Sequence, residues 1–327
     1  MSVPPSVSVD ALRIRCNDAL AAVAANRTPD ALFAPVRYVL QGGGKRVRPV
    51  LVYLVAQAYD VPLKQADPVA LAAEVFHNFT LVHDDIMDAA PERRGRPTVH
   101  EKWDTPTAIL AGDWLMGYAT QLLHEADAPT DALLDVYQPM VDALCVGQAR
   151  DTDFETRTDV TVQAYIDMID GKTGALLAAC MAWGGVLAEV SEADRTQLHE
   201  AGLALGRAFQ IQDDLLDVIA DHDDWGKAIG GDLQVGKRTF ITLTALQRAS
   251  GSTQTWLRDT LFENGGCPPD QIEAVQHTMR DLGVFEAARE AVAQHTASAH
   301  EQLRLLPETP ARAALFDLLD RLQQRAY

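Results

Sequence analysis

The chain has 327 residues, of which 47% are hydrophobic, and it carries a formal net charge of -18. A chain of this size and composition is able to bury a substantial hydrophobic core. The acidic excess argues against nucleic acid as a partner, because phosphate backbones are bound through basic patches. No apolar run is long enough to predict a membrane span, so we expect no integral membrane contact.

The four cysteines are far apart and form no CxxC pair. Their spacing supports neither a zinc site nor a disulfide framework and is typical of reduced thiols. Residues 1–10 lack the basic and then apolar pattern of a signal peptide. We therefore expect a cytoplasmic protein.

Apolar residues recur at three- and four-residue spacings along nearly the whole chain, which predicts helices. The predicted helices span residues 9–25, 47–59, 68–87, 107–126, 131–154, 160–187, 193–219, 240–249, 272–280 and 287–303. Only short breaks rich in glycine and proline separate them. The pattern favours one all-α domain covering residues 1–327.

The first candidate site is an aspartate motif at the end of the helix predicted at 68–87. Asp84 and Asp88 are one helical turn apart and share a face, while Asp85 lies about 100° further round. Carboxylates crowded at a helix C-terminus repel one another and oppose the helix dipole. A cation would relieve both costs, and carboxylate oxygens suit Mg²⁺. For this motif alone, a solvated acidic helix end is an equally good interpretation.

The same spacing recurs at Asp213, Asp214 and Asp217, again after a mostly apolar helix. Two such helices packed side by side would bring six carboxylates to one cavity mouth. That arrangement would hold several Mg²⁺ ions around a diphosphate.

Basic residues beside glycines supply positive charge, opposite to that of the two aspartate motifs. They are Lys45 and Arg48, Arg93 and Arg94, Lys172, Lys227, and Lys237. The start of a helix is an anion site, because its backbone N–H groups point outward and its dipole end is positive. Cations placed so selectively in an acidic chain suggest a diphosphate clamp. Any one of them alone would be interpreted as an ordinary surface residue.

Taken together, these motifs resemble the trans-isoprenyl diphosphate synthases of the polyprenyl synthetase family, especially geranylgeranyl and farnesyl diphosphate synthases. The resemblance runs from about Tyr38 to Thr242. It includes G-G-K-R-x-R-P at 43–49, E-x-x-H-x-x-x-L-x-H-D-D-x-x-D at 74–88, R-R-G-x-P-T-x-H at 93–100, A-I-L-A-G-D at 108–113, G-K-T at 171–173, F-Q-I-x-D-D-x-x-D at 209–217 and G-K-x-x-G-x-D-x-x-x-G-K-x-T at 226–239. One departure is Phe240-Ile241, where Leu-Pro is usual, and we expect it to alter packing rather than abolish activity.

The resemblance implies a bundle of mostly antiparallel helices around a deep apolar cavity, the isoprenoid synthase fold, usually as a homodimer. It also implies a reaction in which isopentenyl diphosphate is added to dimethylallyl, geranyl or farnesyl diphosphate. The allylic diphosphate ionises with the help of Mg²⁺, three ions per active site, then condenses and loses a proton.

The resemblance also implies a role for each matched residue. Asp84, Asp88 and Asp213 would bind Mg²⁺ directly, with Asp85, Asp214 and Asp217 in support. Lys45, Arg48, His77 and Arg94 would hold isopentenyl diphosphate. Arg93, Lys172, Lys227 and Lys237 would hold the allylic diphosphate. Thr173 and Gln210 would place oxygens near the allylic cation.

Product length should depend on the helix that carries the first aspartate motif. Phe79 lies five residues before Asp84, Thr80 beside it is small, and Phe76 lies about a turn further away. This pattern resembles family members that stop near C20, and C15 competes if Phe76 also points into the cavity. Both phenylalanines are equally compatible with ordinary core packing.

Other functions stay open. A metal-dependent phosphohydrolase would leave the second aspartate motif and the arginines unexplained. A class I terpene cyclase would lack the site at Lys45, Arg48 and His77. An inactive regulatory subunit would have eroded aspartate motifs, whereas both are intact here. The sequence leaves open the product length, the preferred primer, the pathway, the oligomeric state and whether the acidic surface is an adaptation to salt.

Overall fold

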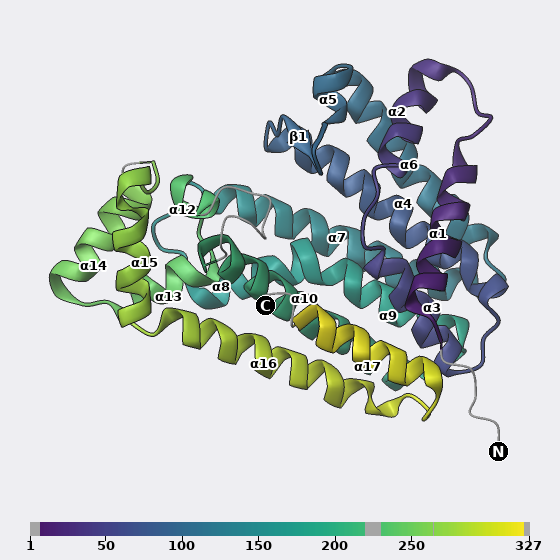
Figure 1. Cartoon of the computed structure of the whole chain (residues 1–327). Coiled ribbons are helices and arrows are strands. Elements are labelled where there is room, and N and C mark those ends of the chain that lie inside the picture. The colour runs from purple at the N-terminus through teal and green to yellow at the C-terminus, as the bar shows by residue number, and fades with distance from the viewer. Residues whose placement is uncertain (1–6, 220–229, 264, 324–327) are drawn as a thin grey trace. The chain divides into compact units, whose positions relative to one another are not determined.

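The computed structural model describes residues 7–219, 230–263 and 265–323, and these residues are mostly helical, with two short strands (Figure 1). This confirms the predicted all-α fold. The chain divides into two compact units. The first comprises Met1–Tyr137, Ala179–Thr196 and Leu305–Leu315, and the second Gln138–Ala178, Gln197–Arg304 and Phe316–Tyr327. A single domain over residues 1–327 stays a prediction.

The first unit is built around a long helix, α4 (Leu63–Met87). Its other elements are α1 (Val9–Val23), α2 (Asp30–Leu40), α3 (Val47–Ala58), a hairpin of β1 (Glu92–Arg93) and β2 (Arg96–Pro97), α5 (Val99–Lys102) and α6 (Thr105–Glu125). α4 packs chiefly on α3 and α6. Alanines and valines along its buried faces, including Ala66, Val69 and Ala73, permit this close packing.

Helices α7 (Thr130–Phe154), α9 (Ala175–Leu187) and α10 (Glu192–Ile219) pass from one unit into the other along the chain, and α10 lies mostly in the second unit. α9 is buried along nearly its whole length, as expected for a helix that is apolar all round. α17 (Pro310–Gln323) likewise begins in the first unit and ends in the second.

The second unit has an apolar core that includes Tyr165, Ile211, Leu215 and Met279. Its elements are α8 (Val162–Ile169), the π turn η1 (Asp170–Gly174), α10 (Glu192–Ile219), α12 (Gly231–Gln234), α13 (Phe240–Arg248), α14 (Gly251–Arg258), the π turn η2 (Asp259–Glu263), the 3₁₀ turn η3 (Pro269–Gln271), α15 (Ile272–Asp281), α16 (Val284–Gln302) and the 3₁₀ turn η4 (Leu303–Leu305). Phe240 and Ile241, the departure from the usual family pattern, are both buried in this unit.

The periodicity of apolar residues does not predict α2, α14 and α17, and it predicts one continuous helix over 160–187. Pro35 lies inside α2, and an internal proline normally ends a helix because it lacks an N–H and clashes with the preceding turn. The π turn η1 interrupts the helix predicted at 160–187. No described helix has both the length and the apolarity that a membrane crossing requires.

The close approach of α10 to α9 gives a first prediction. A Cβ at Gly202 would lie 2.3 Å from the Ala178 Cα, whereas a Cβ at the exposed Gly117 of α6 would meet nothing within 4 Å. Gly202→Ala should therefore destabilise the protein by about 1–3 kcal/mol through overpacking. Gly117→Ala should stabilise it by about 0.5–1 kcal/mol, because alanine favours helix. Thermal unfolding followed by circular dichroism tests the pair, and equal effects would contradict the packing argument.

Candidate active site

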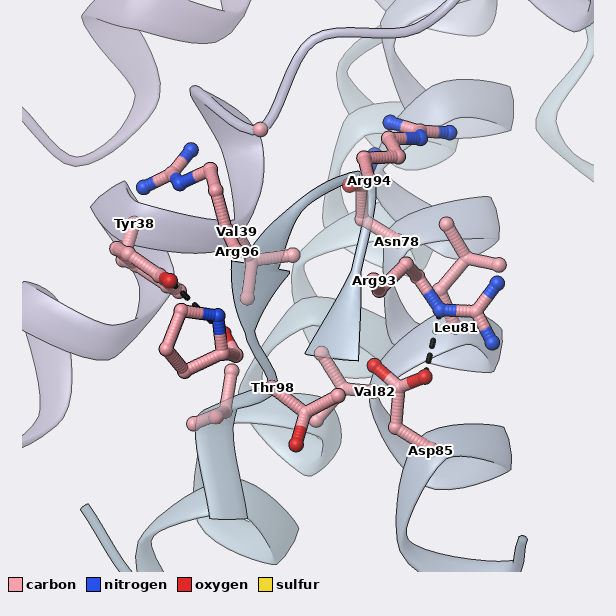
Figure 2. A pocket seen from close by; sticks show the side chains of 13 residues that line it. Tyr38, Val39, Asn78, Leu81, Val82, Asp85, Arg93, Arg94, Arg96 and Thr98 are labelled. Atoms are coloured by element: carbon pink, nitrogen blue, oxygen red, sulfur yellow. Dashed lines mark hydrogen bonds and ion pairs between the residues drawn. The ribbon is translucent and has the colours of Figure 1, made fainter. Parts of the chain in front are cut away.

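The first aspartate motif ends α4 and is bound to Arg93. Arg93 Nε donates to Asp85 Oδ1 over 2.5 Å, and Arg93 Nη2 donates to Asp84 Oδ2 over 3.1 Å. Figure 2 shows the contact with Asp85. Burial raises the pKa of Asp85, and the positive charge of Arg93 opposes this effect. Asp88 is the exposed C-cap residue of α4. Asp84 and Asp88 thus share the helix end, while Asp85 is turned into the protein.

The β1–β2 hairpin orients two consecutive arginine side chains toward different partners. Its strands pair with Arg93 opposite Arg96, and the two turn residues, Arg94 and Gly95, have φ of 55° and 70°. Positive φ at both positions is the requirement of a tight type I′ turn. Arg93 faces the aspartate motif, while Arg94 Nη1 donates to the Gly43 carbonyl. The spacing of the R-R-G motif therefore follows from the turn.

Arg46 anchors the glycine-rich loop before α3. It caps α3 in a left-handed conformation, with φ of 48°. Its Nη1 lies 2.6 Å from Glu74 Oε1 on α4, and both side chains are only 3% exposed. Its other nitrogens donate to Asn17 Oδ1 and the Leu40 carbonyl. The motifs alone predict no role for Arg46 and Glu74, although both residues lie within them.

Arg48 and His77 form the centre of a basic cluster. Arg48 Nη1 lies 3.1 Å from His77 Nε2. Burial, and then Arg48, Arg94 and nearby arginines, lower the pKa of His77 well below 6.5. The ring is therefore neutral, and it accepts from Arg48 at Nε2. Within the described part of the chain, the buried Arg48 Nε has no hydrogen-bond partner.

This concentration of positive charge is suited to an anion. Burial and the neighbouring Arg94 both lower the pKa of Arg48, with Glu74 opposing. A bound anion would relieve the repulsion between these guanidiniums and complete the hydrogen bonding of Arg48. Lys45 lies in the glycine-rich loop just before α3 and is exposed.

The second aspartate motif, at the end of α10, lies in the second unit. Asp214 is 3% exposed and accepts hydrogen bonds from the Tyr165 hydroxyl, from Gln210 Nε2 at 3.1 Å and from the Phe240 N–H at 3.1 Å. Burial raises the pKa of Asp214 to about 7, against the opposing effect of the bonds from Tyr165 and Gln210. Asp214 therefore ties α10 to α8 and α13. The sequence carried no signal for Tyr165.

Asp217 and Lys237 lie near the start of α12. Asp217 Oδ2 accepts from the Asp232 N–H over 2.9 Å, and its carbonyl accepts from the Gly230 N–H. Lys237 Nζ lies 4.0 Å from Asp232 Oδ1. Asp217 and Lys237 are thus both associated with Asp232. Lys227 lies outside the described residues.

Lys172 and Thr173 lie in the π turn η1, and π turns are frequent at functional sites. Lys172 Nζ donates to Asp151 Oδ2 over 2.5 Å, and Thr173 Oγ1 donates to Gln210 Oε1 over 3.0 Å. A Cβ at Gly171 would lie 2.4 Å from the Ala143 carbonyl oxygen, which explains the glycine of the G-K-T motif. Thr173, Gln210 and Asp214 therefore belong to one hydrogen-bonded chain.

The residues expected to set product length differ in exposure. Phe79 and Thr80 are half-buried, whereas Phe76 is 0% exposed. The Phe79 ring lies between the rings of Phe76 and His83, with centroids 5.2 Å and 4.9 Å away. The glycine of the A-I-L-A-G-D motif, Gly112, makes room for His83, because a Cβ there would lie 2.3 Å from His83 Nε2.

Figure 2 shows a pocket on another face of α4. It is lined by α2, by the hairpin and by the face of α4 that carries Leu81, Val82 and Asp85. Phe79 does not line it, because it points to a different side of the helix. This pocket is therefore not the predicted cavity for a growing chain.

In the described residues, no three His, Cys, Asp or Glu side chains converge as a group able to hold a metal ion. The donors nonetheless fit Mg²⁺ in kind. Asp84 and Asp88 offer carboxylate oxygens one turn apart at the negative end of a helix, with Asp88 open to solvent.

Comparison with known proteins identifies the family. The model of the polyprenyl synthetase family matches residues 29–279. The chain belongs to the polyprenyl synthetase family. It is thus a prenyltransferase of the trans-isoprenyl diphosphate synthase class, as predicted, and Mg²⁺ dependence is typical of this family.

The relatives are similar along almost their whole length. The chain is 38% identical to geranylfarnesyl diphosphate synthase of Natronomonas pharaonis, covering 95% of both chains. It is 35% identical to geranylgeranyl diphosphate synthase of Methanosarcina mazei, covering 91% of both. A crystal structure of a geranylgeranyl pyrophosphate synthetase from Pyrococcus horikoshii superposes with a TM-score of 0.90 at 33% identity, covering 97% of both chains.

The contact between Arg48 and His77 gives a second prediction. Because His77 is neutral and acts as an acceptor, a neutral glutamine amide is a matched replacement. His77→Gln should keep KM for isopentenyl diphosphate within about threefold, whereas His77→Leu should raise it about 10- to 100-fold by leaving Arg48 without its acceptor. Steady-state kinetics with saturating allylic substrate measures both variants. If both variants lose affinity equally, the acceptor role assigned to His77 is wrong.

Proposed function

We propose that this enzyme is a geranylgeranyl diphosphate synthase, which extends allylic diphosphates with isopentenyl diphosphate until the product reaches C20. The relatives named above include a geranylgeranyl and a geranylfarnesyl diphosphate synthase, so the comparisons support a short-chain product. The observation that carries the choice of C20 is the half-buried ring of Phe79 next to the fully buried ring of Phe76.

The floor argument follows from the position of Phe79 on α4. Five residues separate it from Asp84, which places it about 7.5 Å along the helix axis. Asp84, Thr80 and Phe79 are each half-buried, whereas Phe76 is completely buried. A tail growing away from the aspartates would therefore meet Phe79 first. A C15 product would require a stop nearer to the aspartates than Phe79, whereas Phe76 is completely buried and lies about 4.5 Å beyond Phe79 along the helix axis.

The basic groups divide between two diphosphates. We assign isopentenyl diphosphate to Arg48, His77, Arg94 and Lys45, and the buried Arg48 Nε, which has no hydrogen-bond partner among the described residues, supports this assignment. Arg93, Lys172, Lys227 and Lys237 would hold the allylic diphosphate. Arg93 supports the assignment because it already contacts two aspartates of the first motif.

We further propose that Asp84, Asp88 and Asp213 bind Mg²⁺, three ions per active site, with Asp85, Asp214 and Asp217 in support. The burial of Asp85 and Asp214 and their contacts with protein donors fit the supporting role. Bound Mg²⁺ would neutralise negative charge on the diphosphates.

The reaction needs no enzyme nucleophile. The allylic C–O bond breaks, and its electron pair leaves with the diphosphate. The negative charge on the departing diphosphate is stabilised by the basic residues assigned to it, Arg93, Lys172, Lys227 and Lys237. The double bond of isopentenyl diphosphate then forms a C–C bond to the allylic cation, and the departing diphosphate takes the proton that is lost. Thr173 Oγ1 and Gln210 Oε1, hydrogen-bonded to each other, would present oxygens to the cation. Apolar walls would exclude water.

We also propose a homodimer that acts in the cytoplasm. Ile109 and Leu110, adjacent on α6, are 42% and 60% exposed, which suits a surface covered by a second copy. Light scattering coupled to size exclusion gives the mass in solution directly.

A product assay gives the third prediction. With labelled isopentenyl diphosphate and dimethylallyl, geranyl or farnesyl diphosphate, the wild type should form C20 only when Mg²⁺ is present. Phe79→Ala should yield longer products, because the first ring in the path is removed. Chromatography of the products after phosphatase treatment measures their length.

Each other outcome points to a different function. Release of diphosphate without any C5-extended product would favour the hydrolase or cyclase, and no turnover in a folded protein would favour the inactive subunit. C15 from the wild type would contradict the choice of product. Chelation by EDTA and restoration by Mg²⁺ serve as the control for metal dependence.

A further inference from the structure

Phe79 belongs to a continuous aromatic column, His83, Phe79, Phe76 and Tyr137, in the first unit. Successive ring centroids lie 4.9, 5.2 and 5.6 Å apart, with interplanar angles of 69°, 63° and 80°. These are edge-to-face contacts, the favourable geometry for aromatic pairs. Three of the rings stand on one face of α4, whereas Tyr137 comes from α7.

The column is held at both ends by polar contacts. At the upper end, His83 Nε2 lies 3.3 Å from the Ile109 carbonyl of α6. At the lower end, the Tyr137 hydroxyl lies 3.1 Å from Thr120 Oγ1, also on α6. Tyr137 is 6% exposed, and burial raises the pKa of its phenol. A buried hydroxyl needs a partner, and Thr120 is the partner that the described residues provide.

We infer that Tyr137, oriented by its hydrogen bond to Thr120, holds Phe76 as a second stop for the growing chain beneath Phe79. The inference rests on the proposed function, because it concerns the length of the same product. Tyr137 is here a positioning residue, since it acts through the Phe76 ring and contacts no reacting atom.

The physical basis is the confinement of Phe76. Its ring is completely buried and touches both Phe79 above and Tyr137 below. When Phe79 is truncated, one neighbour is lost, and the contact with Tyr137 then decides whether the Phe76 ring stays in place. Phe76 lies about 4.5 Å further along the helix than Phe79. The product of Phe79→Ala should therefore lengthen by a limited step and stop again.

The test compares hydroxyl deletions with and without Phe79. Thr120→Val and Tyr137→Phe each remove one hydroxyl and preserve side-chain shape, so either one suffices if the other folds poorly. With Phe79 present, both should leave the product length unchanged. In the Phe79→Ala background, each should increase the ratio of products beyond the second stop by about fivefold, the population change expected from loss of one net hydrogen bond.

Two controls separate positioning from general loosening. Tyr118→Phe removes a tyrosine hydroxyl of α6 outside the column, where the ring stacks on Trp114. Trp183→Phe removes a buried hydrogen bond to the Leu133 carbonyl, one turn before Tyr137 on α7. Neither should alter the products of Phe79→Ala. Melting temperature and total isopentenyl diphosphate consumption are measured for every variant.

The outcomes distinguish this inference from the proposed function. If Phe79→Ala lengthens the product but Thr120→Val and Tyr137→Phe add nothing to it, Tyr137 is ordinary core and the inference fails alone. The inference also fails if Trp183→Phe lengthens the products as much. If the wild type elongates no primer, or if Phe79→Ala leaves the length unchanged, the proposed function or its floor is wrong, and the inference fails with it.

Discussion

The buried ion pair between Arg46 and Glu74 is the interaction on which the basic cluster of Arg48 and His77 in the first unit depends. It joins the residue that begins α3 to α4, three positions before His77. Loss of one partner would leave an uncompensated buried charge, at a cost of about 3–5 kcal/mol. Arg46 tolerates its left-handed backbone because its guanidinium is fully engaged by Glu74, Asn17 and Leu40. The position of Arg48 against His77 follows from this anchor.

The two aspartate motifs share a spacing, but the buried second aspartate of each motif is stabilised by different contacts. In each motif the second aspartate is rotated about 100° from the first, and this turns it into the protein. Asp85 meets the positive charge of Arg93, whereas Asp214 meets neutral donors from a tyrosine, a glutamine and the backbone. Burial raises the pKa of both carboxyls; Arg93 opposes this effect at Asp85, and the bonds from Tyr165 and Gln210 oppose it at Asp214, whose pKa is about 7. Each motif therefore combines aspartates at the helix end with a second aspartate whose contacts inside the protein are structural.

Much of this could be predicted from sequence, because local spacing determines which residues share a helix face. The ends of α4 and α10 and the helix start at Val47 follow from periodicity and motifs. The bond between Tyr165 and Asp214 does not, because the partners are 49 residues apart and only tertiary packing unites them. The hairpin strands are two residues long, too short to show any alternation. Periodicity likewise cannot separate Phe79 from Phe76, since both are apolar residues on one face and differ only in exposure.

α4 unites these features because its three faces carry different chemistry. His77, Asp84 and Asp88 share one face, Glu74 and Asp85 share a second that pairs with arginines, and Phe76, Phe79 and His83 share a third. A rotation of the helix would disturb all three together, and the ion pair from α3 and the hairpin arginine oppose such a rotation. The ion pairs of Glu74 and Asp85 with arginines therefore also fix the direction of the Phe79 ring. Under the proposed function, diphosphate binding and product length are in this way coupled through the orientation of one helix.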